Sequence, residues 1–227
     1  MRRQLMRGFT LIEVLVTLVI LTFGLLGIAG LMAKGQRVSF EAYQRQQAVA
    51  LATDMAERIR ANHTLASICP AKPPEPKAFP GCLTYVAGAP VNTPVGAGLF
   101  YTDYRTGGIK DCGVLSCDIS EIAKYDIALW DGLLNGYSEQ QAGAVNLSGV
   151  IIGARGCIEE IDNQSATCPP PPATGSAYSR TIRISVAWQG NDETAAPTGS
   201  NCGTNLYGVE TKRRVVTYDL LVQHKCP

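Results

Sequence analysis

An apolar run near the start of the chain continues into a polar segment with helical spacing. From Val14 to Ala33 there are 20 consecutive residues without a charge, and an α-helix needs about 20 apolar residues to cross a bilayer core of roughly 30 Å. No proline occurs before Pro70. The pattern therefore predicts one helix from Phe9 to about Asn62. Apolar positions of its polar half keep the helical period, and they are Val38, Ala42, Tyr43, Val49, Ala52, Met55, Ala56 and Ile59.

Three segments in the last third of the chain have strand patterns. Residues 150–158 are rich in apolar side chains, and residues 181–188 and 216–223 alternate between apolar and mostly polar positions. The connections between them are long and contain prolines, which favours an antiparallel sheet over a doubly wound parallel one. We expect an α+β fold in which one face of the sheet packs on the long helix.

The region between helix and strands contains most of the turn-forming residues. Prolines and glycines are frequent over residues 69–111, which predicts a long surface connection. Asp118 and Glu121 then have the spacing of a capping box, and Asn135-Gly136 is a helix stop signal. We therefore predict a helix over 119–135.

The charge balance disfavours nucleic-acid binding by bulk electrostatics. The chain has 227 residues with 20 Lys+Arg against 19 Asp+Glu, and its formal net charge is +1. A local cationic cluster is the remaining candidate for such binding. Its residues are Arg180, Arg183, Lys212, Arg213 and Arg214.

The cysteines indicate an oxidising compartment. They are even in number and all follow the apolar run, and no C-x-x-C pair suggests zinc. Of the 105 connectivities that eight cysteines allow, the simplest joins sequence neighbours. These pairs are Cys69–Cys82, Cys112–Cys117, Cys157–Cys168 and Cys202–Cys226.

The sequence lacks the motifs of common enzyme classes. It contains no P-loop, no dinucleotide fingerprint, no G-x-S-x-G and no H-E-x-x-H. We therefore predict a protein that is not an enzyme and holds no cofactor or metal. The two histidines, His63 and His224, are interpreted as residues at element ends, and the group Glu159, Glu160 and Asp162 as a solvated acidic turn rather than a calcium site. Glycosylation sequons begin at Asn62, Asn146 and Asn163.

The first residues have the composition of a membrane-targeting leader. Three arginines and no acid precede Gly8, which keeps this end cytoplasmic by the positive-inside rule. Glu13 lies inside the apolar helix, where a carboxylate is costly. The segment Arg7-Gly8-Phe9-Thr10-Leu11-Ile12-Glu13-Val14 resembles the class III processing site of type IV prepilins.

That resemblance implies a processing reaction and a role for Glu13. A membrane aspartyl prepilin peptidase would cleave between Gly8 and Phe9, and the new amine of Phe9 would be N-methylated. A Phe9 ammonium is a natural partner for the Glu13 carboxylate of a neighbouring subunit in an apolar environment. Loss of Arg2, Arg3 and Arg7 would change the formal charge of the side chains from +1 to −2.

The resemblance also implies a type IV pilin fold with five segments. These are a leader (1–8), a transmembrane and assembly helix (9–33), its amphipathic continuation (34–63), a disulfide-stapled connecting region (64–149) and a sheet with a C-terminal disulfide region (150–227). Two shorter segments, Tyr125–Trp130 and Gly153–Ile158, resemble the PilV-type minor pilins.

The function expected from the resemblance is that of a minor pilin, which promotes assembly of type IV pili for adhesion and twitching motility. The alternatives are a type II secretion pseudopilin and a pilus-tip adhesin or DNA-uptake subunit. The expected partners are the prepilin peptidase, minor and major pilins bound through the N-terminal helix, the inner-membrane assembly platform and membrane lipid. The chain would cross the bacterial inner membrane once, with a periplasmic globular domain, before joining a pilus at the cell surface.

Overall fold

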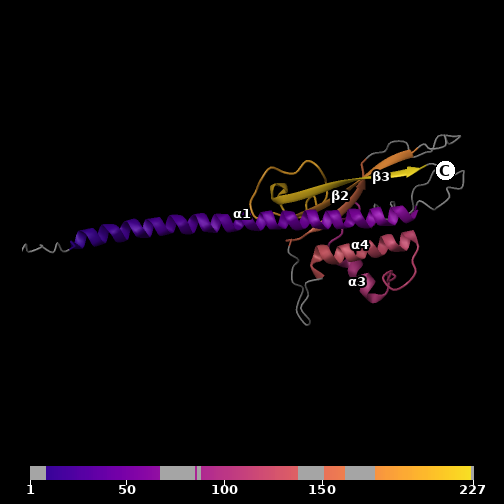
Figure 1. Ribbon diagram of the computed structural model, residues 1–227, viewed down its shortest axis with the longest axis horizontal. Helices are drawn as coiled ribbons and strands as arrows, with labels where there is room; N and C mark the ends of the chain where they lie inside the picture. Colours follow the sequence, from indigo (N-terminus) through magenta and orange to yellow (C-terminus); the bar gives the residue numbers. More distant parts are fainter. Residues whose placement is uncertain (1–8, 67–84, 86–87, 138–150, 162–176, 226–227) are drawn as a thin grey trace, which may run out of the picture. The chain divides into compact units, whose positions relative to one another are not determined.

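The computed structural model describes residues 9–66, 85, 88–137, 151–161 and 177–225. It divides into a first unit that ends at Tyr43 and a second unit that begins at Gln44. Its main elements are α1 (Leu11–Ala66), α3 (Leu99–Thr106), α4 (Ile119–Asn135), β1 (Arg155–Glu160), β2 (Ala177–Gln189) and β3 (Arg213–Lys225) (Figure 1). Helix α1 contributes to both units. The side chains of 63–66, 177–180 and 223–225 lie outside the described set.

Helix α1 confirms the predicted long helix, with a start two residues later and an end four residues later than expected. Thr10 precedes its first turn, and the backbone N–H of Glu13 lies 3.4 Å from the Thr10 hydroxyl. The segment Leu11–Asn62 is long and apolar enough to cross a membrane, with a mean hydropathy of 2.6 in its apolar window. The hydroxyls of Thr17 and Thr22 donate to helix carbonyls at 2.9 and 2.8 Å, so they remain satisfied in lipid.

The second unit contains an antiparallel sheet with the strand order β1-β2-β3. All three predicted strands are confirmed, although β1 begins at Arg155 rather than near residue 150. The reason is local, because Gly153 has a φ of 62° and forms a turn before the strand. Strands β2 and β3 pair over 13 residues each without a bulge.

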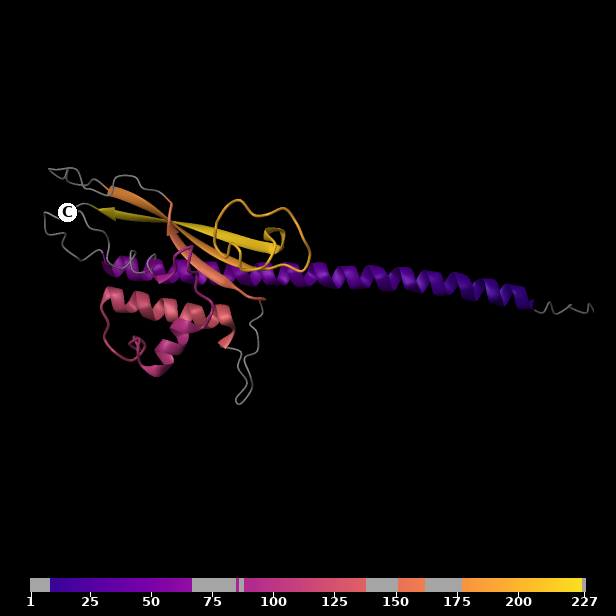
Figure 2. The ribbon, with the colours of Figure 1, turned by 180° about the vertical axis from the view of Figure 1, so that it is seen from behind.

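The core of the second unit lies between α1, the sheet and α4. Figure 2 shows the later part of α1 running between the sheet and α4. The alanines at 48, 52 and 56 recur every fourth residue and are fully buried in one cluster with Ile158, Ile184 and Leu220 of the sheet. The indole N–H of Trp130 on α4 donates to the Leu51 carbonyl at 3.0 Å. As expected, one face of the sheet packs on the long helix.

The prediction of a surface connection over 69–111 is wrong for its second half. Tyr85, Ala89 and Val95 are buried in the core, and Leu99–Thr106 forms helix α3. Val95 and Gly156 exchange backbone hydrogen bonds at 2.9 and 2.8 Å, so this segment covers the edge of β1. Residues 69–84 lie outside the described residues.

Helix α4 has the predicted bounds. Asp118 and Glu121 form both hydrogen bonds of the capping box, at 2.7 and 3.0 Å, and Gly136 closes the helix with a φ of 76°. Local signals at both ends therefore determined this element.

The disulfides confirm one predicted pair and correct two others. Cys112 is bonded to Cys117 as expected. Cys157 is bonded to Cys202, so the predicted pairs Cys157–Cys168 and Cys202–Cys226 are wrong. The loop between β2 and β3 folds back over the face of the sheet on which Cys157 lies, and this brings Cys202 to it. Cys69, Cys82, Cys168 and Cys226 lie outside the described residues.

Candidate processing and assembly site

The predicted processing site lies at the first residues that the structure describes. Gly8 falls outside them. Phe9 is 84% exposed and precedes α1 by two positions. Glu13 lies in the first turn of α1 and is exposed, where the positive end of the helix dipole favours a carboxylate. The structure thus places Phe9 and Glu13 within one turn of each other.

Glu13 is an acidic residue within the exposed, apolar first part of α1. Within the part of the chain that the structure describes, its carboxylate has no ion pair. The side chains around it are large and exposed, including Leu11 at 84% and Ile12 at 65%. An unpaired carboxylate in such a setting needs either the lipid headgroup region or a cation from another molecule. This arrangement can bind a positively charged group.

Three described members of the predicted cationic cluster do not form a free surface of positive charge. Arg183 makes a two-pronged ion pair with Asp219 at 2.7 and 2.8 Å, which lowers the pKa of the Asp219 carboxyl. Arg214 donates to the carbonyls of Asp192 and Thr211. Arg213 is only 4% exposed. Three of the five predicted cations are thus engaged inside the second unit, and the Arg180 side chain lies outside the described set.

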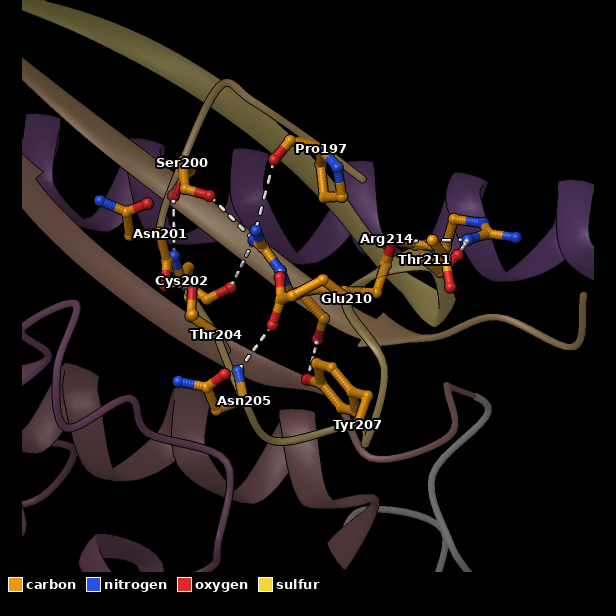
Figure 3. A network of polar contacts seen from close by, with 12 residues as sticks. Pro197, Ser200, Asn201, Cys202, Thr204, Asn205, Tyr207, Glu210, Thr211 and Arg214 are labelled. Carbon is orange, nitrogen blue, oxygen red and sulfur yellow. Dashed lines mark hydrogen bonds and ion pairs between the residues drawn. The ribbon is translucent and has the colours of Figure 1, made fainter. Parts of the chain in front are cut away.

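Arg213 is the centre of a buried cluster of polar contacts. Its guanidinium binds the Glu210 carboxylate at 2.6 Å and donates to the carbonyls of Ser200 and Cys202 at 2.8 and 3.1 Å (Figure 3). The Asn205 N–H and the Arg213 pair hold the pKa of the Glu210 carboxyl below its usual range. The sequence pattern predicts Arg213 in a surface cluster of cations, whereas the structure shows it as a buried structural residue.

The acidic group near residue 160 is not a turn. Glu159 and Glu160 are the last two residues of β1 and pair with Arg183 and Ile182 of β2, whereas Asp162 lies outside the described residues. No cluster of His, Cys, Asp or Glu that could hold a metal ion occurs among the residues for which coordinates are described.

The sequon at Asn62 is buried. Asn62 is 3% exposed, and its amide donates to the Tyr85 hydroxyl at 3.2 Å and to the Ile119 carbonyl at 3.0 Å. A glycan cannot attach there in the folded chain. Asn146, Asn163 and the side chains of His63 and His224 lie outside the described set.

Two buried carboxylates on α4 were missed by the sequence analysis. Asp131 is fully buried and accepts backbone N–H groups of Gly96, Gly98 and Tyr101 at 2.6, 3.1 and 3.1 Å. Asp126 accepts from the Tyr85 hydroxyl and pairs with Arg58 on α1 at 3.2 Å. Burial raises the pKa of Asp126 although Tyr85 and Arg58 oppose the rise. The available signal was the presence of two acids on the apolar side of a predicted helix.

Comparison with known proteins assigns the N-terminus to a family motif. Residues 3–29 match the family described as the prokaryotic N-terminal methylation motif. No curated protein and no solved structure matches the chain. The motif contains the class III prepilin leader and indicates a type IV pilin-like or pseudopilin-like protein that is processed by prepilin peptidase.

The fold agrees with this class. A long helix with an apolar N-terminal half, an antiparallel three-stranded sheet packed on its second half, and disulfides together form a pilin-like α+β fold. Among the residues that the structure describes, α1 is the one helix long and apolar enough to cross a membrane, and its first part lies within the matched motif. Pilin-like proteins are structural rather than enzymatic, as the sequence analysis predicted.

Proposed function

We propose that the protein is a minor pilin, a structural subunit that promotes initiation and assembly of type IV pili. Prepilin peptidase cleaves between Gly8 and Phe9, and the amine of Phe9 is then methylated. The observation that supports this most is the Glu13 carboxylate, which lies one turn into the exposed apolar helix without an ion-pair partner in the described chain.

Glu13 gives the assembly step its selectivity. A carboxylate at the bilayer centre costs about 2.5–3.5 kcal/mol on insertion scales, and breaking a buried pair leaves a similar penalty. The Phe9 ammonium of an adjacent subunit offsets that cost when the two helices pack in the correct register. The processed helix is therefore retained in the membrane when alone and favoured in the filament when paired.

The second unit supports a pilus subunit over a minimal secretion pseudopilin. It adds α3, α4 and a disulfide-linked loop to the helix and sheet, and such additions give a pilus subunit a larger surface for neighbouring minor and major pilins. The inner-membrane assembly platform and lipid contact the chain before assembly. A DNA-uptake role has less support, because Arg183, Arg213 and Arg214 are engaged within the fold.

The test compares Glu13→Ala and Glu13→Gln with the wild type in piliated cells. We expect both variants to lose the leader normally and to stay in the membrane, but to be depleted at least tenfold from sheared pili. Glu57→Ala is the matched control, because Glu57 is an exposed acid of α1 beyond the apolar run. Equal incorporation of the Glu13 variants would refute the proposed role. Recovery of the wild-type chain only in a secretion pseudopilus would assign it to that system instead.

A further inference from the structure

The loop between β2 and β3 holds one half of a long-range disulfide. This β2–β3 loop comprises residues 190–212 and contains Cys202. Cys157, Ala187, Cys202 and Tyr207 form a small buried cluster apart from the main core. The Tyr207 hydroxyl lies 2.9 Å from the Gly153 carbonyl and 3.0 Å from that of Ala187. The loop is therefore fixed to the sheet by more than its disulfide.

Arg213 holds the loop from a position that the sheet determines. It is the first residue of β3 and pairs with Gln189 in the register of the β2–β3 hairpin. From there its guanidinium donates to three loop carbonyls, those of Pro197, Ser200 and Cys202, at 3.3, 2.8 and 3.1 Å (Figure 3). Because the hairpin alone places Arg213, this contact does not depend on the disulfide.

Both backbone polar groups of Cys202 are held by this cluster. Its carbonyl accepts from Arg213, and its N–H donates to the Ser200 hydroxyl at 3.1 Å. Glu210 neutralises the guanidinium with one oxygen and accepts the Asn205 N–H with the other at 2.7 Å. The cluster thus fixes the backbone position of Cys202 before any bond to Cys157 is required.

The observed pairing is not the one that chain entropy favours. Cys157 and Cys202 are separated by 45 positions, whereas Cys168 lies 11 positions from Cys157. Loop-closure probability falls with about the 3/2 power of length, so closure to Cys168 is favoured about eightfold in an unfolded chain. Closure of Cys202 to Cys226, which is 24 positions away, is favoured about 2.5-fold on the same basis.

We propose that Arg213 and Glu210 select Cys157 as the partner of Cys202 during oxidative folding. First β2 and β3 pair, and the Arg213 guanidinium then donates hydrogen bonds to the carbonyls of the β2–β3 loop. These contacts hold the Cys202 thiol beside the Cys157 thiol. The two thiols then lose two protons and two electrons to an external disulfide, which is reduced to two thiols. Arg213 is therefore a positioning residue that determines disulfide specificity, independently of the minor pilin role.

The test is refolding of the full chain in detergent from the reduced, denatured state with a glutathione redox buffer. Non-reducing digestion and mass spectrometry then measure the ratio of Cys157–Cys202 to all other bridges of these two cysteines. We expect the ratio to fall at least fivefold in Arg213→Ala, and to fall less in Glu210→Gln and Arg213→Lys. The displaced partners should be Cys168 and Cys226.

Arg58→Ala is the matched control, because it breaks a partly buried ion pair with Asp126 and Arg58 is not part of the cluster around Cys157 and Cys202. It should leave the pairing ratio unchanged. Native pairing in Arg213→Ala, or equal mispairing in Arg58→Ala, would overturn the proposal. If Arg213→Ala fails to fold, the test rests on Glu210→Gln. Native disulfide pairing and unchanged refolding kinetics in Glu210→Gln would then overturn the proposal that the Arg213–Glu210 pair selects Cys157 as the partner of Cys202.

Discussion

Asp131 provides the sharpest test of how the second unit is held together. Helix α3 has no side-chain cap from its own sequence, since its N-cap residue is Gly98. The Asp131 carboxylate on α4 instead accepts the Tyr101 N–H of the first turn at 3.1 Å, and it also accepts the N–H groups of Gly98 and of Gly96 in the turn before the helix, at 3.1 and 2.6 Å. One buried carboxylate therefore caps a helix and fixes the turn before it.

The magnitude follows from the number of donors that the carboxylate satisfies. A buried unsatisfied polar group costs about 1–3 kcal/mol, and Asp131 satisfies three donors, so Asp131→Ala should lower the free energy of unfolding by about 3–9 kcal/mol. Asp131→Asn keeps the shape and one acceptor oxygen, but turns an amide donor toward the Tyr101 N–H, and about 2 kcal/mol is expected. Total stability of a domain is about 5–15 kcal/mol, so the alanine variant approaches global unfolding.

Urea unfolding of the full chain in detergent measures the change, with the buried Trp130 and Trp188 as fluorescence probes. Hydrogen exchange should show selective loss of protection at the Tyr101 amide in Asp131→Asn. The control is Asp103→Asn, since Asp103 is an exposed acid of α3 and should change stability by less than about 0.5 kcal/mol. Wild-type stability and unchanged Tyr101 protection in Asp131→Asn would refute the capping role.

Three further predictions concern the same unit. Because burial raises the pKa of Asp126, the folded state binds a proton on this carboxyl more readily than the unfolded state does. The stability that this group contributes is therefore present at low pH and is lost as pH rises through the raised pKa. In urea titrations, the free energy of unfolding of the wild type relative to that of Asp126→Asn should rise as pH falls from 7 to 4. Gln44 is fully buried and its amide has no hydrogen-bond partner within the part of the chain that the structure describes, so Gln44→Met should raise the urea midpoint by the equivalent of about 1–2 kcal/mol, and a lower midpoint contradicts this. A Cβ at Gly156 would collide with the Trp130 ring, so Gly156→Ala should lower the thermal midpoint through overpacking of about 1–3 kcal/mol, whereas an unchanged midpoint would show that the ring can move.

The elements that could be predicted from the sequence are those with local determinants. Helix α4 has its cap, its apolar period and its stop residue within its own segment, so its bounds were predicted correctly. Strand β3 was found from alternation alone. Helix α3 was missed because its cap comes from Asp131, 32 positions after the helix begins, and because glycines at both of its ends resemble a loop.

The disulfide error has the same physical origin. Pairing by sequence proximity uses only loop-closure entropy, whereas the structure places Cys202 by the register of β2 and β3 and by the Arg213 cluster. Arg213 itself is an ordinary cation in the sequence, and its burial depends on carbonyls that only the folded loop brings together. At the N-terminus, the contiguous motif from Arg7 to Val14 was enough to identify the leader, because a peptidase reads its processing signal as a linear segment.

The Cys157–Cys202 bond also limits how far a subunit can be stretched. A fully extended chain spans at most about 3.3–3.6 Å per residue, so the 45-residue separation stores about 150 Å of contour length that tension on the chain outside the bond cannot release. The same bond encloses β2 but leaves β3 outside the ring. Under load, β3 can therefore peel away from the sheet while the enclosed strand β2 stays inside the disulfide ring, and relaxation of the load lets β3 return to a strand that tension has not extended.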